Sequence, residues 1–322
     1  MPERLYISTL ASFIEELIAV KRLCGYAYVA EAYTLERLDK FCLSIAYEET
    51  TVTQKLTAAW AEALPEEGQA SKQSRMSALR QLSLHMRSRG IESFVPRGHV
   101  SRDAPIAYIP TKAEIGALFS MIDSYNTVRW QYMAWGYRVA YRLMYCCGLR
   151  ISECSGLAAS DVDANEGTLF IRHSKGAKDR LVYMADDMTA MVAHHMDRLR
   201  QELGFSPEWL FPGRIPTNPI LKNTFDRKFS EFWSKVSDAP KHVKHPTPHS
   251  LRHAFVVNRM NEWMAEGVSL DQMMPYLAAY LGHSGGNETF YYYHQVKESF
   301  ALVRKKDKIS SRVIPEVIRY EN

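Results

Sequence analysis

Apolar residues recur at helical spacing through the first part of the chain. Spacings of three and four residues favour amphipathic helices, which bury one face and leave the other in water. Three such stripes are formed by Leu10, Phe13, Ile14, Leu17 and Ile18, by Tyr33, Leu35, Leu38, Phe41 and Leu43, and by Met76, Leu79, Leu82 and Met86. The third stripe predicts a helix from Ser71 to about Arg89, followed by Gly90. We therefore predict an N-terminal helical domain over residues 1–95.

A different pattern follows this domain. Pro96, Gly98, Pro105 and Pro110 interrupt every regular spacing, which predicts an interdomain linker over residues 96–110. Thr111, with Glu114 three residues later, is typical of a capping box that begins a helix. A second domain is expected over residues 111–300, with a C-terminal tail over residues 301–322.

The second domain is predicted to be mainly α with one small β element, an α+β arrangement. A long apolar helix is expected from Trp130 to Cys147, and another helix from Asn223 to Val236. Between them, residues 167–172 and 180–184 are rich in strand-forming side chains. They flank the polar segment 175–179, which predicts a hairpin with Lys175 and Lys178 near its tip.

Composition is that of a globular protein. The chain has 322 residues, 46% hydrophobic and 24% charged, and five cysteines without a CxxC pair. No apolar run approaches the ~18 residues of a membrane span, and the first residues lack the pattern of a secretory signal. These features predict a cytoplasmic protein with reduced cysteines and no membrane partner.

Charge is unevenly distributed although the net charge is only +4. Residues 1–70 carry six basic and eleven acidic side chains, whereas residues 71–99 carry six basic and one acidic. A solvated helix face explains such a run without further function. A helix that contacts nucleic-acid phosphates explains it too, with Lys72, Arg75, Arg80 and Arg87 as the candidates.

Several familiar motifs fail on mechanical grounds. The run Gly282–Gly286 matches the serine hydrolase elbow, but no acid and histidine follow it at the distances that fold needs. His245, His249 and His253 have metal-ligand spacing, but two prolines between them prevent a shared helix face. Neither a GK dipeptide nor a GxG is present, so nucleotide-binding loops are not indicated. We expect no metal and no cofactor.

A spread set of cations, imidazoles and one tyrosine remains. Arg150 follows the helix-ending Gly148, with Glu153 as its expected partner, and His249 and Arg252 begin a helix after two prolines. His283 precedes Tyr292 by nine residues. Arginines and imidazoles can hold the charge that develops on a phosphate under attack. A tyrosine can then act as the nucleophile, and a hairpin lysine can protonate the leaving oxygen.

These motifs, in this order and spacing, resemble the tyrosine recombinases, the phage integrase family, over about residues 107–300. The resemblance implies a two-domain clamp on double-stranded DNA, whose first domain is the core-binding domain. It also implies a covalent 3′-phosphotyrosine, a Holliday junction, four protomers on two sites, and no metal or ATP. By similarity, the catalytic residues are Arg150, Lys175, His249, Arg252, His283 and Tyr292.

Finer expectations rest on the same resemblance. Tyr291 and Tyr293 flank the nucleophile, and spacing alone selects Tyr292. Further DNA contacts are expected from Lys178, Lys222, Arg227 and Lys228. The tail could dock on a neighbouring protomer through Val313, Val317 and Ile318, or pack on its own domain. Accessory DNA-bending or directionality factors are possible partners.

Two alternatives for function stay open, a catalytically silent DNA-binding protein and a type IB topoisomerase-like enzyme. The preferred role is the integration or excision of a mobile element at the nucleoid of a bacterial cell.

Overall fold

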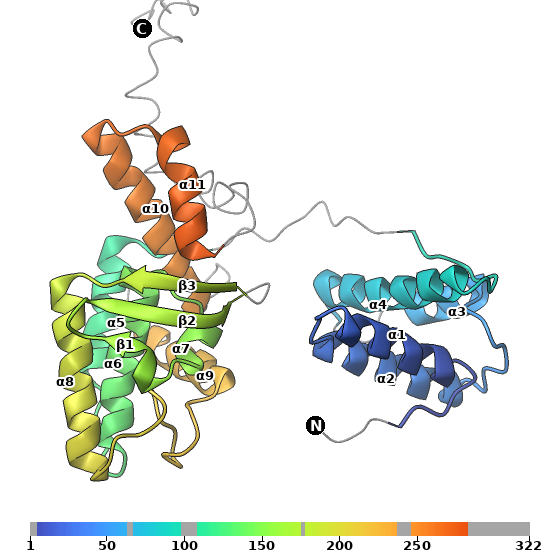
Figure 1. The fold of residues 1–322 in the computed structure, drawn as a ribbon, viewed down its shortest axis with the longest axis horizontal. Helices are drawn as coiled ribbons and strands as arrows, with labels where there is room; N and C mark the ends of the chain where they lie inside the picture. Colours follow the sequence, from blue (N-terminus) through green and yellow to red (C-terminus); the bar gives the residue numbers. More distant parts are fainter. Residues whose placement is uncertain (1–4, 63–66, 98–107, 175–177, 237–245, 283–322) are drawn as a thin grey trace, which may run out of the picture. The chain divides into compact units, whose positions relative to one another are not determined.

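The computed structural model describes residues 5–62, 67–97, 108–174, 178–236 and 246–282. The chain divides into two compact units, Met1–Pro105 and Ile106–Asn322, which are drawn in Figure 1. The division falls inside the segment that the sequence predicts as a linker. Each unit has a hydrophobic core of its own.

The first unit contains four helices within its described residues, all of them amphipathic. They are α1 (Ala11–Leu23), α2 (Val29–Ser44), α3 (Gln54–Ala61) and α4 (Gln69–Ser88). The first stripe supplies the core with Leu10, Ile14 and Leu17, each no more than 2% exposed. The second stripe is only partly right, because Tyr33 and Leu43 are exposed while Ala32 and Cys42 take the buried positions on α2.

Arg75 on α4 lies inside the first unit rather than on its surface. Its guanidinium is 3% exposed, donates to the carboxylate of Glu67 and to the carbonyl of Trp60, and stacks 4.7 Å from the Trp60 ring centroid. The structure thus corrects the expectation that Arg75 is a phosphate contact. A long side chain can cross the helix surface to an acidic partner that spacing along the helix does not reveal.

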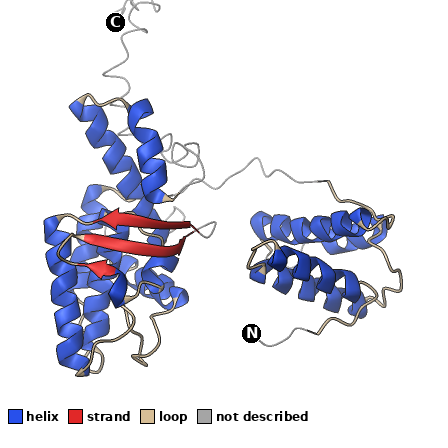
Figure 2. Ribbon diagram, viewed as in Figure 1, coloured by secondary structure: helices blue, strands red, loops and turns tan. Residues whose placement is uncertain are grey.

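The second unit is mostly helical with a small sheet at one side (Figure 2). Its described helices are α5 (Lys112–Ser124), α6 (Gln131–Cys146), α7 (Ile151–Ser155), a 3-10 turn η1 (Ala159–Asp161), α8 (Asp186–Leu203), α9 (Lys222–Trp233), α10 (Pro248–Glu266) and α11 (Leu270–Leu281). The predicted capping box is present, since Thr111 and Glu114 exchange hydrogen bonds at the start of α5.

Helix α6 forms the centre of this unit and packs against α8 and α10. Tyr141, which is fully buried on α6, donates a hydrogen bond of 2.8 Å to the carbonyl of Phe225 on α9. The long apolar helix predicted from the sequence is therefore the core of the domain. No helix within the described ranges is long and apolar enough to cross a bilayer.

The sheet contains the predicted hairpin and one strand that the sequence pattern did not indicate. Strands β2 (Thr168–Ser174) and β3 (Lys178–Tyr183) pair antiparallel, and β1 (Val162–Asp163) adds to the outer edge of β2. On β3, Arg180 and Val182 lie two residues apart and hence on one face of the strand. Val182 is fully buried, so this face is the one turned toward the body of the domain.

Candidate phosphate-binding site

The turn between α6 and α7 places Arg150, and a glycine makes the turn possible. Gly148 has φ +65°, a left-handed conformation that favours glycine. A Cβ atom at this position would lie 2.7 Å from Cδ1 of Phe255 and 3.0 Å from Cδ2 of Leu281. Gly148 therefore lets the turn approach α10 and α11 closely, and the next residues begin α7 with Arg150 at its N-cap.

Glu153 fixes Arg150, as the sequence predicts. One carboxylate oxygen accepts from the Arg150 backbone N–H at 2.7 Å, and the other accepts from Nη1 of the same residue at 2.8 Å. Burial raises the pKa of Glu153, but the hydrogen bonds and charge of Arg180, together with the Arg150 N–H and the charge of Arg252, outweigh it and lower the pKa to about 2. The carboxylate is thus ionised throughout the physiological range.

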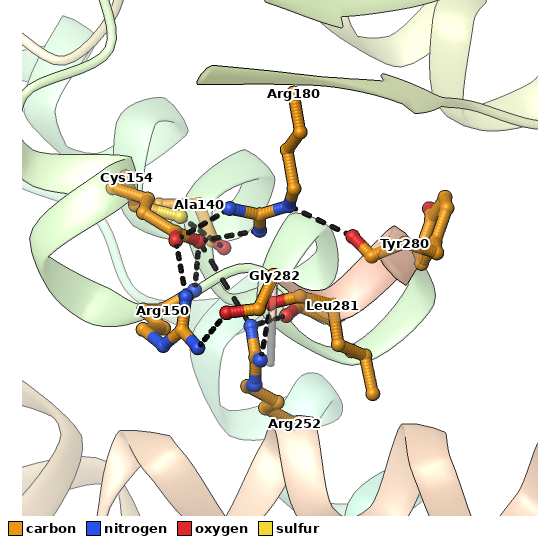
Figure 3. Close-up of polar contacts among 10 residues, drawn as sticks. Ala140, Arg150, Cys154, Arg180, Arg252, Tyr280, Leu281 and Gly282 are labelled. Atoms are coloured by element: carbon orange, nitrogen blue, oxygen red, sulfur yellow. Dashed lines mark hydrogen bonds and ion pairs between the residues drawn. The ribbon is translucent and has the colours of Figure 1, made fainter. Parts of the chain in front are cut away.

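Arg180 is a partner of Glu153 that the sequence analysis missed. It reaches the carboxylate from β3 with both terminal nitrogens, at 2.7 and 2.8 Å, the forked geometry that suits a guanidinium to a carboxylate. The alternation of β3 was the available signal, because Arg180 shares the face of the buried Val182. Figure 3 shows Arg150, Arg180 and Arg252 converging on this region.

Arg252 lies deeper than the other two arginines. It is 2% exposed, and Nη1 and Nη2 donate to the carbonyls of Gly148 and Leu281 at 2.6 and 2.7 Å. Its Nη1 also lies 3.9 Å from Glu153. Arg252 thereby links the α6–α7 turn to the end of α11. It comes from the helix start that the sequence predicts, because α10 begins at Pro248.

The end of α11 accepts hydrogen bonds from all three arginines. The carbonyls of residues 280, 281 and 282 accept from Arg180, Arg252 and Arg150 at 2.8, 2.7 and 3.1 Å (Figure 3). The last carbonyls of a helix lack partners within it and carry its negative dipole end. Three cations therefore cap α11 immediately before the segment that contains His283.

A pocket of about 520 Å³ opens beside Arg150. The starts of three helices meet there, with Arg150–Ser152 at α7, Lys222 at α9 and Thr247–His249 at α10. Helix N-termini present backbone N–H groups and the positive end of the dipole, and so favour anions. Asp226 and Ser230 complete the lining. The pocket thus brings together two predicted catalytic residues, Arg150 and His249, and one predicted DNA contact, Lys222.

His249 lies in a strongly cationic setting. Burial lowers its pKa first, and the charges of Arg252 and Arg150 lower it further, to about 4. Its ring packs edge-on against His253 with centroids 4.3 Å apart. At neutral pH the imidazole is therefore uncharged.

The other predicted DNA contacts differ in exposure. Arg87 and Arg227 are exposed, and Lys72 is partly exposed. Arg80 is partly exposed and donates to the carbonyl of Pro96. Lys228 pairs with Glu231 at 2.8 Å and lies 3.8 Å from the Tyr125 ring centroid, so it is engaged within its own domain.

Some predicted residues lie outside what the structure describes. These are Lys175, His283 and Tyr292 of the catalytic set, the neighbouring Tyr291 and Tyr293, the side chain of Lys178, and the tail residues Val313, Val317 and Ile318. Among the side chains that are described, no group of three or more His, Cys, Asp or Glu could hold a metal ion.

The model of the phage integrase family matches residues 111–299, which is more than half of the chain. The chain belongs to this family, and the matched region contains every residue of the site described above.

Individual relatives agree with that assignment. The chain is 35% identical over 114 residues to the integrase/recombinase homologue y4eF of Sinorhizobium fredii strain NGR234. These aligned residues make up 35% of this chain and 42% of that protein. It is 28% identical over 241 residues to tyrosine recombinase XerD of Rhizobium meliloti strain 1021, which covers 71% of each. In the match to y4eF, the chain spans less than half the length of that relative.

A solved structure of a lambda integrase tetramer bound to a Holliday junction has the same fold. The TM-score is 0.62 at 17% identity, over 89% of this chain and 77% of that one. The expected fold class, mainly α with a small sheet, is confirmed.

Proposed function

We propose that this protein is a site-specific DNA recombinase that cuts and rejoins strands through a 3′-phosphotyrosine on Tyr292. The observation that carries the proposal is the pocket where Arg150, Lys222 and His249 meet beside the N-termini of α9 and α10. Such a pocket suits one phosphate group of a DNA backbone. Because relatives in the same family are named integrases and tyrosine recombinases, DNA is the fitting source of that phosphate.

The reaction assigns a role to each residue. The hydroxyl oxygen of Tyr292 attacks phosphorus, a P–O bond to tyrosine forms, and the P–O5′ bond breaks. Arg150 and the helix N-termini stabilise the charge on the non-bridging oxygens. The neutral imidazole of His249 accepts the phenol proton, and Lys175 donates a proton to the leaving 5′ oxygen. Arg252 and His283 complete the phosphate contacts, as the family resemblance implies.

Religation reverses these steps with a different 5′ hydroxyl. Bond energy is kept in the phosphotyrosine, so the exchange uses neither ATP nor a metal. We further propose that four protomers act on two DNA sites through a Holliday junction, in the manner of the lambda integrase tetramer. Integration or excision of a mobile element is the role we favour.

The first unit supplies DNA contacts in this proposal. Helix α4 buries its apolar stripe and turns Lys72 and Arg87 outward. In the second unit, Lys222 on α9 lines the pocket, and Arg227 on the same helix is exposed. Contacts of this kind bind the backbone without reading sequence, so they position the duplex for cleavage.

Trapping the covalent intermediate tests the proposal. The full chain is incubated in EDTA with nicked suicide duplexes taken from the DNA that flanks its own gene, and covalent protein–DNA adducts are resolved on denaturing gels. We expect an adduct with wild type, Tyr291→Phe and Tyr293→Phe, and none with Tyr292→Phe. An adduct that persists in Tyr292→Phe contradicts the assigned nucleophile. Binding without any adduct in the wild type contradicts the proposed chemistry.

A further inference from the structure

One buried carboxylate is shared between an arginine of the pocket and an arginine of the hairpin. Glu153 accepts from Arg150 on one side and from the fork of Arg180 on the other. Arg150 lines the pocket, whereas Arg180 does not. The side chain of Arg180 is only 9% exposed, so its role is exerted through the groups it contacts.

Those contacts join three parts of the domain that are distant in sequence. Arg180 belongs to β3 of the hairpin, Glu153 to α7, and the Tyr280 carbonyl, which accepts from Nε of Arg180 at 2.8 Å, to α11. Through its three donor atoms, this guanidinium thus fixes the distances between the hairpin, the turn that contains Arg150 and the end of α11. The hairpin leads to Lys175, and α11 leads to His283.

We propose that Arg180 is a positioning residue of the recombination site, which orients Arg150 through Glu153 and sets the hairpin against the end of α11. The expected effect on cleavage rests on the proposed function. The expected effect on the contact between Glu153 and Arg150 does not depend on it. Groups that hold the ligands of a reaction centre in place commonly change activity by about 10- to 100-fold when removed.

Another arginine in the same sheet provides a matched control. Arg172 on β2 also pairs with a buried carboxylate, donating from Nε to Asp161 at 2.8 Å. Neither residue of that pair lines the pocket beside Arg150. The Arg172 side chain is 58% exposed, against 9% for that of Arg180. Arg172→Gln therefore removes an ion pair of the same sheet without touching Glu153, and it reports what the loss of such a pair does to cleavage.

The kinetic arm compares single-turnover cleavage of the suicide duplex and duplex affinity in the full chain. We expect Arg180→Gln to slow cleavage by about 10- to 100-fold and Arg172→Gln by less than about threefold, with duplex affinity nearly unchanged in both. Arg180→Lys keeps the buried charge but loses the fork, so it should fold and should fall between wild type and Arg180→Gln. Equal slowing by Arg180→Gln and Arg172→Gln overturns the proposal, as does an Arg180→Lys protein indistinguishable from wild type.

A spectroscopic arm needs no DNA, so it separates this inference from the proposed function. Side-chain carboxyl carbons of ¹³C-labelled glutamate are titrated by NMR, and the Glu153 signal is assigned by its loss in Glu153→Gln. The cations that face Glu153 are Arg150, Arg180 and Arg252. Removing Arg180 takes away the strongest of the effects that lower the pKa of Glu153, so the titration moves upward in Arg180→Gln and, to a smaller extent, in Arg180→Lys.

The two arms give distinguishable failures. If no duplex yields an adduct with wild type but the Glu153 titration moves in the Arg180 variants and not in Arg172→Gln, the proposed chemistry fails and the positioning contact stands. If the Glu153 titration is the same in wild type and the Arg180 variants, the positioning role is refuted whatever the cleavage assay shows.

Discussion

Replacing Gly148 with alanine should strongly destabilise the second unit. Two costs add at this position. The left-handed backbone at φ +65° costs an L-residue about 1–2 kcal/mol. The added methyl group would lie 2.7 Å from the Phe255 ring and 3.0 Å from Leu281, and overpacking of this kind costs about 1–3 kcal/mol. The expected loss is about 2–5 kcal/mol.

That loss is large beside the total stability of a domain, about 5–15 kcal/mol. It also acts on the site, because the Gly148 carbonyl is an acceptor of Arg252 and Leu281 provides the other. A shift of the turn would therefore move Arg150 and Arg252 together. We expect Gly148→Ala to lower both the free energy of unfolding and the yield of covalent adduct.

Urea unfolding of the full chain, followed by fluorescence, measures the effect, with Gly204→Ala as the control. Gly204 also has a positive φ, +75°, but nothing lies within 4 Å of an added Cβ. The difference between the two variants isolates the packing cost from the backbone cost. Losses that agree within about 0.5 kcal/mol would refute the claim that close packing at residue 148 organises the site.

Two further predictions concern burial of charge. Arg75→Gln removes the guanidinium that pairs with the buried Glu67 carboxylate, so we expect a loss of about 3–5 kcal/mol in the first unit, measured by thermal unfolding. Lys72→Gln should leave stability unchanged, and equal melting temperatures for the two variants would show that Arg75 is not structural. Burial and neighbouring arginines lower the pKa of His249 to about 4, and burial lowers the pKa of His195 to about 4 as well. Both values lie below the ordinary one near 6.5, so the unfolded chain takes up these protons first as the pH drops. The free energy of unfolding is therefore full above pH ~6.5 and falls as the pH drops toward 4. The fall in the urea midpoint between pH 7.5 and pH 5 should be smaller in His249→Gln than in wild type, and His195 contributes to the fall that remains. An unchanged fall in His249→Gln would contradict the low pKa.

Local patterns predicted those parts of the molecule whose causes are local. The capping box at Thr111 and the Arg150–Glu153 pair each depend on residues three positions apart, and the helix start at Pro248 depends on two nearby prolines. All three are present. Helical stripes indicated much of the core of the first unit for the same reason.

Contacts set by tertiary packing were the ones missed. Arg180 lies 27 residues from Glu153, and only the hairpin geometry brings them together. Arg75 looks like any basic residue on a polar helix face until Trp60 and Glu67 cover it. β1 contains only two residues, too few for an alternating pattern. Helical spacing also placed Tyr33 in the core, because it cannot show where the edge of a buried face lies.

The cap on α11 also sets the earliest stage of synthesis at which Arg150, Arg180 and Arg252 can all reach their acceptors. Arg150 and its acceptor at Gly282 are 132 residues apart, and Arg252 bonds across 104 residues to Gly148. Contacts between such distant residues form late in folding, since a long loop must close before they return any free energy. During synthesis, a ribosome must release residue 282 before the three arginines can meet their acceptors. A nascent chain whose first unit is already complete therefore still lacks the three-arginine cap on α11, so the pocket beside Arg150 is assembled only after residue 282 has been added.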